Sequence, residues 1–393
     1  MGATAMKTSK VWRPRAASSH LFVMFYITVL LLFSDLQLSH STRSMSSKNS
    51  RLESEAMPST MEDVESDFLS WIASVGAKSK SSSLAPITRL PSSVKAVPQV
   101  YYVDVAGFGN FKTVQEAVNA VPDGNSMQVL IIVKPGTYRE RVTIPKSKGY
   151  ITLQGAGKNV TFIEYDMNAA TAGSTYDSAT VAVFSDYFVA KDISFKNSAP
   201  APPAGAVNMQ AVALRITGDC AAFYNCGFYG SQDTLNDDMG RHYYKNCEIV
   251  GSIDFIFGDA QSLYKDCTLN VNAATYGSVT AQKRESSNKN TGFSFVGCNL
   301  LGSGQVYLGR AWGPYSRVVF AFTFMQDIVI REGWHNWNVP DRQRTAYYGQ
   351  YKCSGPGATE LGRVAWSHEL TDAEAAPFLT LSFIDGQNWV TEP

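Results

Sequence analysis

A short pattern recurs along the chain and limits the folds that it can adopt. Each copy has an aromatic or apolar residue, then Asn, Asp or Gly, then Cys, one further residue and an apolar residue. The copies with Cys are Phe223–Phe228, Tyr244–Ile249, Tyr264–Leu269 and Phe295–Leu300, and Val189–Phe195 is a copy without Cys. The equivalent positions 193, 226, 247, 267 and 298 lie 33, 21, 20 and 31 residues apart. One unit of about 20 residues therefore repeats, with insertions.

The residues within each copy indicate short strands that stack into a solenoid. β-branched and aromatic residues bounded by Gly, Asn or Asp are typical of strands. A unit of this size cannot bury its own apolar face and must stack on its neighbours. The pattern therefore predicts an all-β fold, a parallel β-helix. The pairs Thr113 and Glu116, and Thr371 and Glu374, have capping-box spacing, which predicts two short helices that close the ends of the solenoid.

The six cysteines have two interpretations. Four of them occupy the repeat position, so they are either a buried ladder of small hydrophobic side chains or partners in disulfides between adjacent coils. Stacked strands lie about 4.8 Å apart, a spacing that permits either arrangement. The sequence contains no Cys-x-x-Cys pair and its five His are scattered. It therefore predicts no metal site.

The first 95 residues differ from the rest. Residues 21–33 form an uncharged apolar run after a basic start, too short for the roughly 20 residues that span a bilayer. We predict a cleaved signal peptide at 1–40, with a buried helix or a signal anchor as the alternatives. Residues 41–95, rich in Ser, Lys and Pro with a helical-looking piece at 61–73, are predicted to be a linker or short pro-segment. Residues 96–393 form the predicted β-helix domain.

The charge balance excludes one class of function. The whole chain has 34 basic and 34 acidic residues, so nothing supplies the basic patch of a nucleic-acid binder. Six basic residues and one acidic residue lie in the first fifty. Removal of a signal peptide would therefore leave a mildly acidic protein that does not stay in the membrane. In a secreted protein, Asn159 in Asn-Val-Thr would be a glycosylation sequon.

Polar residues recur at the period of the coil. Gln210, Gln232 and Asp254 are each 22 residues apart, and Asp233 precedes Asp254 by 21. On coils of that length these side chains would stack as a column on one face. A structural ladder of amides and carboxylates and a catalytic site both fit the spacing, because perturbed carboxylates occur in either setting.

The surroundings of Asp254 point to a paired carboxylate. In Ile253–Phe257, strand alternation would place Asp254 on the face opposite the aromatic residues. A carboxylate in so apolar a strand is costly unless it is paired, and Arg310 from a later coil is the predicted partner. Trp312 and Trp334 are again 22 residues apart. This spacing predicts two aromatic platforms of the kind that receive sugar rings.

Five motifs in chain order resemble those of plant pectin methylesterases (pectinesterases), in the form that lacks a large inhibitor-like pro-domain. They are Gly136–Val142, Gln210–Leu214, Gln232–Leu235, Asp254–Gly258 and Leu308–Trp312, within roughly residues 96–393. The resemblance implies a right-handed parallel β-helix. It also implies a secreted, monomeric cell-wall enzyme that removes methyl esters from homogalacturonan (pectin) and releases methanol without a metal or organic cofactor. A proteinaceous inhibitor stays open as a partner.

The resemblance also implies roles for individual residues. Asp254 matches the family's nucleophile and Asp233 its proton donor and acceptor. Gln210 and Gln232 match the amides of the oxyanion hole, and Arg310 would orient Asp254 and keep it ionised. The positions that match substrate contacts are Thr180, Gln210, Arg310 and Trp312. Trp334 is added to them as the second predicted platform.

Four positions depart from the residues that are common in the family. Ala311 replaces Pro, Asn236 replaces Tyr, Lys283 replaces Gly and Asp259 replaces Asn. None of these changes removes a catalytic group. Asn236 and Lys283 nevertheless motivate an alternative, a pectin-binding wall protein with weakened catalysis. A further alternative is a chain-cleaving β-helix enzyme such as a pectin lyase or polygalacturonase, which the esterase motifs disfavour.

Overall fold

The computed structural model describes residues 70, 99–203 and 205–392. The chain divides into two units, Met1–Asp63 and Val64–Pro393, and every described residue belongs to the second. The predicted signal peptide and all of the predicted linker except residue 70 lie outside the described residues. Among those that are described, no helix is long and apolar enough to cross a bilayer.

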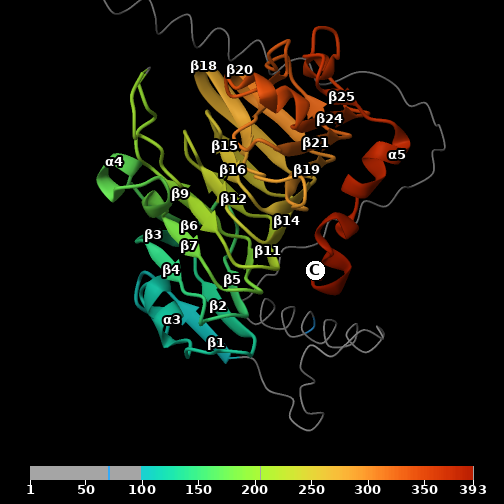
Figure 1. The fold of residues 1–393 in the computed structure, drawn as a ribbon. Coiled ribbons are helices and arrows are strands. Elements are labelled where there is room, and N and C mark those ends of the chain that lie inside the picture. Colours follow the sequence, from blue (N-terminus) through green and yellow to red (C-terminus); the bar gives the residue numbers. More distant parts are fainter. Residues whose placement is uncertain (1–69, 71–98, 204, 393) are drawn as a thin grey trace, which may run out of the picture. The chain divides into compact units, whose positions relative to one another are not determined.

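Successive coils of the chain build long sheets of parallel strands (Figure 1). Within the described residues, eleven strands form one sheet. In spatial order they are β1 Gln99–Val103, β2 Val129–Val133, β5 Ile151–Gln154, β8 Val189–Lys191, β11 Ala221–Tyr224, β14 Arg241–Lys245, β17 Gln261–Lys265, β19 Gly292–Val296, β21 Arg317–Ala321, β24 Tyr347–Tyr351 and β25 His368–Glu369.

The remaining strands form two further faces joined by long strands. One face holds β3 Gly136–Arg139, β6 Thr161–Tyr165, β9 Ser194–Asn197, β12 Gly227–Tyr229, β15 Glu248–Gly251 and β22 Phe324–Met325. The other holds β4 Val142–Ile144, β7 Val181–Val183, β10 Leu214–Ile216, β13 Leu235–Asp237, β16 Ile256–Gly258 and β23 Trp334–His335. The strands β18 Thr268–Gln282 and β20 Asn299–Arg310 run across both. The predicted fold class, a parallel β-helix, is confirmed.

The sequence repeat marks one corner of each coil. Its Asn, Asp or Gly residues have left-handed backbone conformations, with φ near +50 to +70°, which these residue types adopt more readily than others. Two later copies, at Phe322 and Lys352, share the conformation although they lack the favoured residue type. The corner residues are Asp192, Asn225, Asn246, Asp266, Gly297, Phe322 and Lys352. The repeat therefore marks a position that needs a left-handed backbone conformation, as well as residues that are buried in the core.

The interior of the solenoid contains a column of stacked rings. Neighbouring ring centroids lie 4.5–4.7 Å apart, with interplanar angles of 6–15°. The column consists of Phe223, Tyr244, Tyr264, Phe295 and Phe320, one from each of five successive coils. Offset stacking of this kind adds to the stabilisation from burial.

All six cysteines are free. Four of them donate a weak hydrogen bond to the carbonyl of a column residue in the preceding coil. These four are Cys247, Cys267, Cys298 and Cys353. Of the two interpretations, the structure has the buried ladder of thiols and not disulfides between coils.

The two predicted capping boxes are both present, but only the first helix closes an end. Helix α3, Val114–Ala120, buries its apolar side in the core beside the first coil. Helix α5, Asp372–Ala375, begins a tail that packs along the outer side of the eleven-stranded sheet (Figure 1). That packing buries Phe378, Phe383 and Ile384 against strand residues. A further short α-helix is α4 Ala169–Ala172. The described residues also form the 3₁₀ helices η1 Tyr176–Ser178, η2 Pro340–Arg344, η3 Pro356–Ala358, η4 Ala376–Phe378, η5 Leu381–Ile384 and η6 Gly386–Asn388.

Candidate active site

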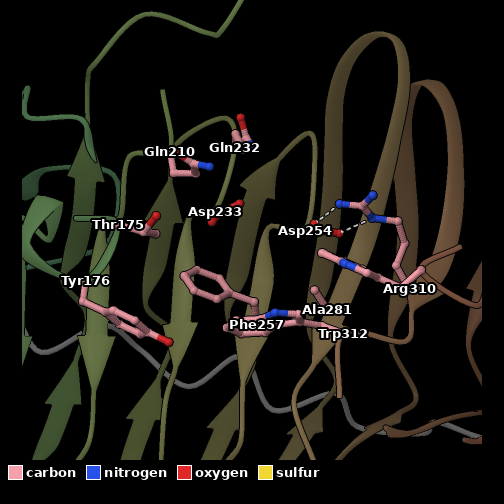
Figure 2. Close-up of a pocket in the computed structure, with 11 residues that line it drawn as sticks. Thr175, Tyr176, Gln210, Gln232, Asp233, Asp254, Phe257, Ala281, Arg310 and Trp312 are labelled. Atoms are coloured by element: carbon pink, nitrogen blue, oxygen red, sulfur yellow. Dashed lines mark hydrogen bonds and ion pairs between the residues drawn. The ribbon is translucent and has the colours of Figure 1, made fainter. Parts of the chain in front are cut away.

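A cleft of about 300 Å³ lies over β10, β13 and β16 (Figure 2). Gln210 lies before β10, Gln232 and Asp233 before β13, and Asp254 before β16. The 22-residue spacing thus brings all four side chains into one cavity. The residues that line it are Thr175, Tyr176, Gln210, Gln232, Asp233, Asp254, Phe257, Ala281, Arg310, Trp312 and Trp337.

Both carboxylates enter the cleft from left-handed turns. Asp233 has φ +64° and Asp254 has φ +47°, so neither lies within a regular strand. The prediction that Asp254 faces away from Phe255 and Phe257 by strand alternation is therefore wrong in part. The turn interrupts the alternation, so Phe255 packs in the core while Phe257 lines the cleft with Asp254. Asp and Asn are among the few residues that adopt this conformation readily.

Arg310 and Ser278 hold the carboxylate of Asp254. Arg310 donates from Nε to Oδ1 at 2.8 Å and from its second terminal nitrogen to Oδ2 (Figure 2). Ser278 Oγ donates to Oδ1 at 2.5 Å and accepts the backbone N–H of Asp254 at 2.9 Å. Burial acts to lower the pKa of Arg310, but the hydrogen bond and charge of Asp254 outweigh it and raise that pKa. The pair is therefore bidentate and charge-assisted.

Asp233 has a different environment from Asp254. Its carboxyl group is half-buried and forms no hydrogen bond within the described residues. Burial, followed by the nearby charge of Asp254, raises its pKa well above the ordinary value, and Arg310 opposes this shift only in part. Two neighbouring carboxyl groups thus have different environments: Asp254 is ion-paired, and Asp233 holds its proton more tightly than a free aspartic acid does.

Gln210 and Gln232 lie above Asp233 in the cleft lining (Figure 2). The side-chain Oε1 of Gln210 is buried and has no hydrogen-bond partner within the described residues. A buried polar group without a partner costs free energy, so it is expected to have a function or a ligand. Gln210 thus presents an unused polar atom beside the two carboxyl groups, and the amide of Gln232 lines the same cleft.

Aromatic rings form the walls of the cleft. Trp312 packs against Phe257, with ring centroids 6.2 Å apart, and Tyr176 lines the opposite end. The ring of Trp337 lies 4.2 Å from the guanidinium carbon of Arg310, a cation–π contact that supports the position of the arginine. The sequence predicted only Trp312 of these rings, because Tyr176 and Trp337 lie outside the strands and Phe257, although it lies in β16, was expected to face away from Asp254.

Two predicted substrate contacts are wrong. Trp334 is 2% exposed and stacks on Tyr348 in the core, with ring centroids 4.4 Å apart. Its side chain points inward from β23, so it cannot serve as a platform. Thr180 is fully buried, and its hydroxyl donates to the carbonyl of Lys196 at 3.0 Å. The 22-residue spacing of Trp334 from Trp312 matches the coil, but period alone does not distinguish the inner from the outer face of a strand. The prediction for Thr180 rests on the family resemblance alone.

Three of the four departures have packed or paired side chains. Ala311 and Asn236 are fully buried, and the Asn236 amide donates to the carbonyl of Phe257 at 3.3 Å. Asp259 accepts a hydrogen bond from Thr291 at 2.6 Å and pairs with Lys289. Lys283 instead extends to the cleft wall formed by Trp312. Among the described residues, no group of three or more His, Cys, Asp or Glu is placed to hold a metal ion.

Comparison with known proteins shows which family the chain belongs to. The pectinesterase family model matches residues 101–387. "Probable pectinesterase 8" of Arabidopsis thaliana is 51% identical over 296 residues, which is 73% of this chain and 75% of that protein. Pectinesterase QRT1 of the same organism is 48% identical over 304 residues, 75% and 79% of the two chains. The structure of pectin methylesterase from carrot matches with a TM-score of 0.70 and 36% identity, covering 76% of this chain and 96% of the carrot chain.

These relationships establish an enzyme of the carboxylic ester hydrolase class. The chain belongs to the pectinesterase family.

Proposed function

We propose that this protein removes methyl esters from the homogalacturonan of pectin, with Asp254 as nucleophile and Asp233 as proton donor and acceptor. One observation carries the proposal. An ion-paired carboxylate lies beside a carboxyl group of raised pKa, below two amides, in a cleft. Family membership supports the reaction, and the geometry supports the assignment of roles.

In the first half-reaction, a carboxylate oxygen of Asp254 attacks the carbonyl carbon of the methyl ester. The amide N–H groups of Gln210 and Gln232 stabilise the negative charge that develops on the carbonyl oxygen. The carbon–oxygen bond to the methoxy group then breaks, and Asp233 gives its proton to the leaving oxygen. Methanol departs and an acyl-enzyme anhydride remains on Asp254.

In the second half-reaction, Asp233 takes a proton from water. The resulting hydroxide attacks the acyl carbon, and the bond to the Asp254 oxygen breaks. The uronic acid leaves and gives its proton to solvent to become a free uronate, Asp254 regains its carboxylate, and Asp233 is again protonated. The raised pKa of Asp233 suits this role, because it favours the protonated form that the first half-reaction needs.

Arg310 and Ser278 are positioning residues in this scheme. Their hydrogen bonds fix the Asp254 carboxylate at the turn: Oδ1 accepts two of them, while Oδ2 accepts one from Arg310 and retains a lone pair for attack. Trp312 supplies an apolar surface for a sugar ring. The signal-like N-terminal segment supports secretion to the cell wall, which also belongs to the proposal, as does a monomeric state.

Methanol release tests the reaction directly. Purified protein and highly methylated pectin should yield methanol and free uronate in equal amounts, while the length of the polymer stays constant. Asp254→Asn and Asp233→Asn should release almost none. Wild-type protein that binds pectin without any turnover at pH 5 to 9 would contradict the proposal and favour a pectin-binding wall protein. Shortened polymer would favour a chain-cleaving enzyme.

A further inference from the structure

Lys283 places a positive charge at the wall of the cleft. It directly follows β18, whose residue Ala281 lines the cavity, and its backbone N–H donates to the carbonyl of Gly258 at 2.7 Å. The ammonium nitrogen lies 4.8 Å from the ring centroid of Trp312, another lining residue. The backbone contact and the cation–π contact thus hold the charge beside the cavity.

The ammonium group of Lys283 has no acidic partner within the described residues. The neighbouring cations all have other contacts. Arg310 pairs with Asp254, Lys289 pairs with Asp259, and Arg284 donates to backbone carbonyls such as that of Lys289 at 2.8 Å. The charge of Lys283 is therefore not neutralised by the protein and is available to a ligand.

At the opposite end of the cleft, the cation beside the aromatic wall is paired with a carboxylate. There the guanidinium of Arg215 lies 4.8 Å from the ring centroid of Tyr176, which also lines the cavity. Arg215 donates to the carboxylate of Asp238 at 2.9 Å. The cleft thus has a cation beside an aromatic wall at each end, but only the Trp312 end has a cation without a carboxylate.

We propose that Lys283 makes the Trp312 end of the cleft selective for a free carboxylate on the sugar that neighbours the reacting ester. This inference rests on the proposed function, because it assumes a galacturonan in the cleft. Along that polymer a neighbouring sugar is either a neutral methyl ester or an anionic uronate. An unpaired ammonium can bind the anion and gains nothing from the ester.

Two kinds of measurement test the inference with the variants Lys283→Met and Lys146→Met. Methionine keeps the length of the side chain without its charge, and Lys146 is an exposed lysine on an early coil. The first measurement is kcat/KM for methanol release from two galacturonan oligomers of equal length, one fully and one partly methyl-esterified. The second is the affinity for the fully unesterified oligomer by calorimetry, made in an Asp254→Asn background.

Lys283→Met should lower kcat/KM on the partly esterified oligomer about three- to fivefold, since a partly exposed ion pair contributes up to about 1 kcal/mol. On the fully esterified oligomer it should stay within about twofold. The affinity for the unesterified oligomer should fall by the same three- to fivefold factor, and 0.5 M salt should reduce the difference. Lys146→Met should behave as wild type in both measurements.

Equal losses on both esterified oligomers, or an unchanged affinity for the unesterified one, would overturn the inference. The proposed function fails by a different result, the absence of methanol from either oligomer with the wild-type protein. In that case the calorimetric comparison still decides whether Lys283 binds a carboxylate in the cleft.

Discussion

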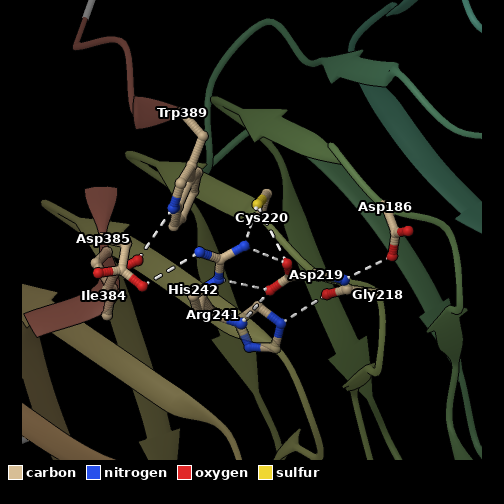
Figure 3. A network of polar contacts seen from close by, with 9 residues as sticks. All are labelled: Asp186, Gly218, Asp219, Cys220, Arg241, His242, Ile384, Asp385 and Trp389. Atoms are coloured by element: carbon tan, nitrogen blue, oxygen red, sulfur yellow. Dashed lines mark hydrogen bonds and ion pairs between the residues drawn. The ribbon is translucent and has the colours of Figure 1, made fainter. Parts of the chain in front are cut away.

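Among the described residues, two arginine–aspartate pairs are bidentate and have different surroundings. Arg310 pairs with Asp254 in the cleft, and Arg241 pairs with Asp219 on the side that the C-terminal tail covers (Figures 2 and 3). The side chain of Asp254 is 7% exposed and that of Asp219 is 42% exposed. Chemically the two pairs are alike, so the pairing alone does not mark an active site.

The pair outside the cleft uses its hydrogen-bonding capacity within the protein. Asp219 accepts from the backbone N–H of Arg241 at 2.9 Å and from two nitrogens of its side chain. The remaining terminal nitrogen of Arg241 reaches Asp385 in the tail at 3.3 Å (Figure 3). This pair therefore fastens the tail to the solenoid.

The cleft pair has neighbours with unused capacity. Asp233 has a raised pKa and no hydrogen bond within the described part of the chain, and Gln210 has a buried oxygen without a partner there. Unused donors and acceptors around an ion pair, rather than the ion pair itself, distinguish a chemical site from a structural one.

The same substitution at both pairs should give the largest contrast. Asp254→Asn removes the nucleophile and should lower kcat for methanol release by about 10⁴-fold, as loss of a catalytic group does in other hydrolases. Asp219→Asn should change kcat less than about twofold. Circular dichroism should show that both variants are folded. Comparable losses of activity in the two variants would remove the distinction between the pairs.

Replacing the arginine of each pair should lower the free energy of unfolding by different amounts. Arg310→Met leaves a nearly buried carboxylate without its partner and should lower the free energy of unfolding by about 3 kcal/mol. Arg241→Met leaves a carboxylate that water reaches, so a loss of about 1 kcal/mol is expected. Urea unfolding measures both values. A larger loss for Arg241→Met would mean that attachment of the tail matters more than burial of the charge.

The raised pKa of Asp233 predicts an opposing effect on stability. A group whose pKa is raised by folding stabilises fully below its unfolded value, 3.8, and loses that contribution as pH rises through the folded value. Asp233→Asn should therefore raise Tm by a few degrees at pH 7 and by less at pH 4, while abolishing activity. Thermal unfolding at the two pH values tests this, and an unchanged Tm at pH 7 would contradict it.

The pair outside the cleft should respond to acid in the opposite sense and more weakly. Burial of Asp219 acts to raise its pKa, but hydrogen bonds from Arg241 outweigh it and lower the pKa to about 2. Its contribution is therefore present above pH 3.8 and is lost as pH falls toward 2. The Tm difference between wild type and Asp219→Asn should be constant near neutral pH and shrink below about pH 4. A difference independent of pH would contradict this assignment.

The column of site residues could be predicted because the coil and the sequence share one period. Leu235 pairs with Ile256, 21 positions later, so Asp233 and Asp254 enter the cleft at equivalent turns. Ser278 lies 24 residues after Asp254 and could have been found by the same search. The spacing equals the length of one backbone coil, so it predicts which residues occupy equivalent positions in successive coils.

Side-chain direction and the tail could not be predicted in this way. Trp334 and Trp312 share the period, yet one ring points into the core and the other into the cleft. The capping box at Thr371 predicted a helix correctly, but its packing along a sheet depends on contacts such as Tyr224 to Thr391, 2.8 Å apart and 167 residues apart in sequence. Such long-range contacts have no local signal.

The column of stacked rings has a consequence for how the molecule opens. Within the column, each ring stacks only on the rings of the adjacent coils, so loss of the coil at one end of the column removes one stacking contact, as in a one-dimensional chain of coupled units. The rings span the coils from Phe223 to Phe320, which also carry Asp233, Asp254 and Arg310. Amide hydrogen exchange should therefore be slowest in these coils and faster in the first ones. Fluctuations that fray the early coils would leave the geometry of the cleft unchanged.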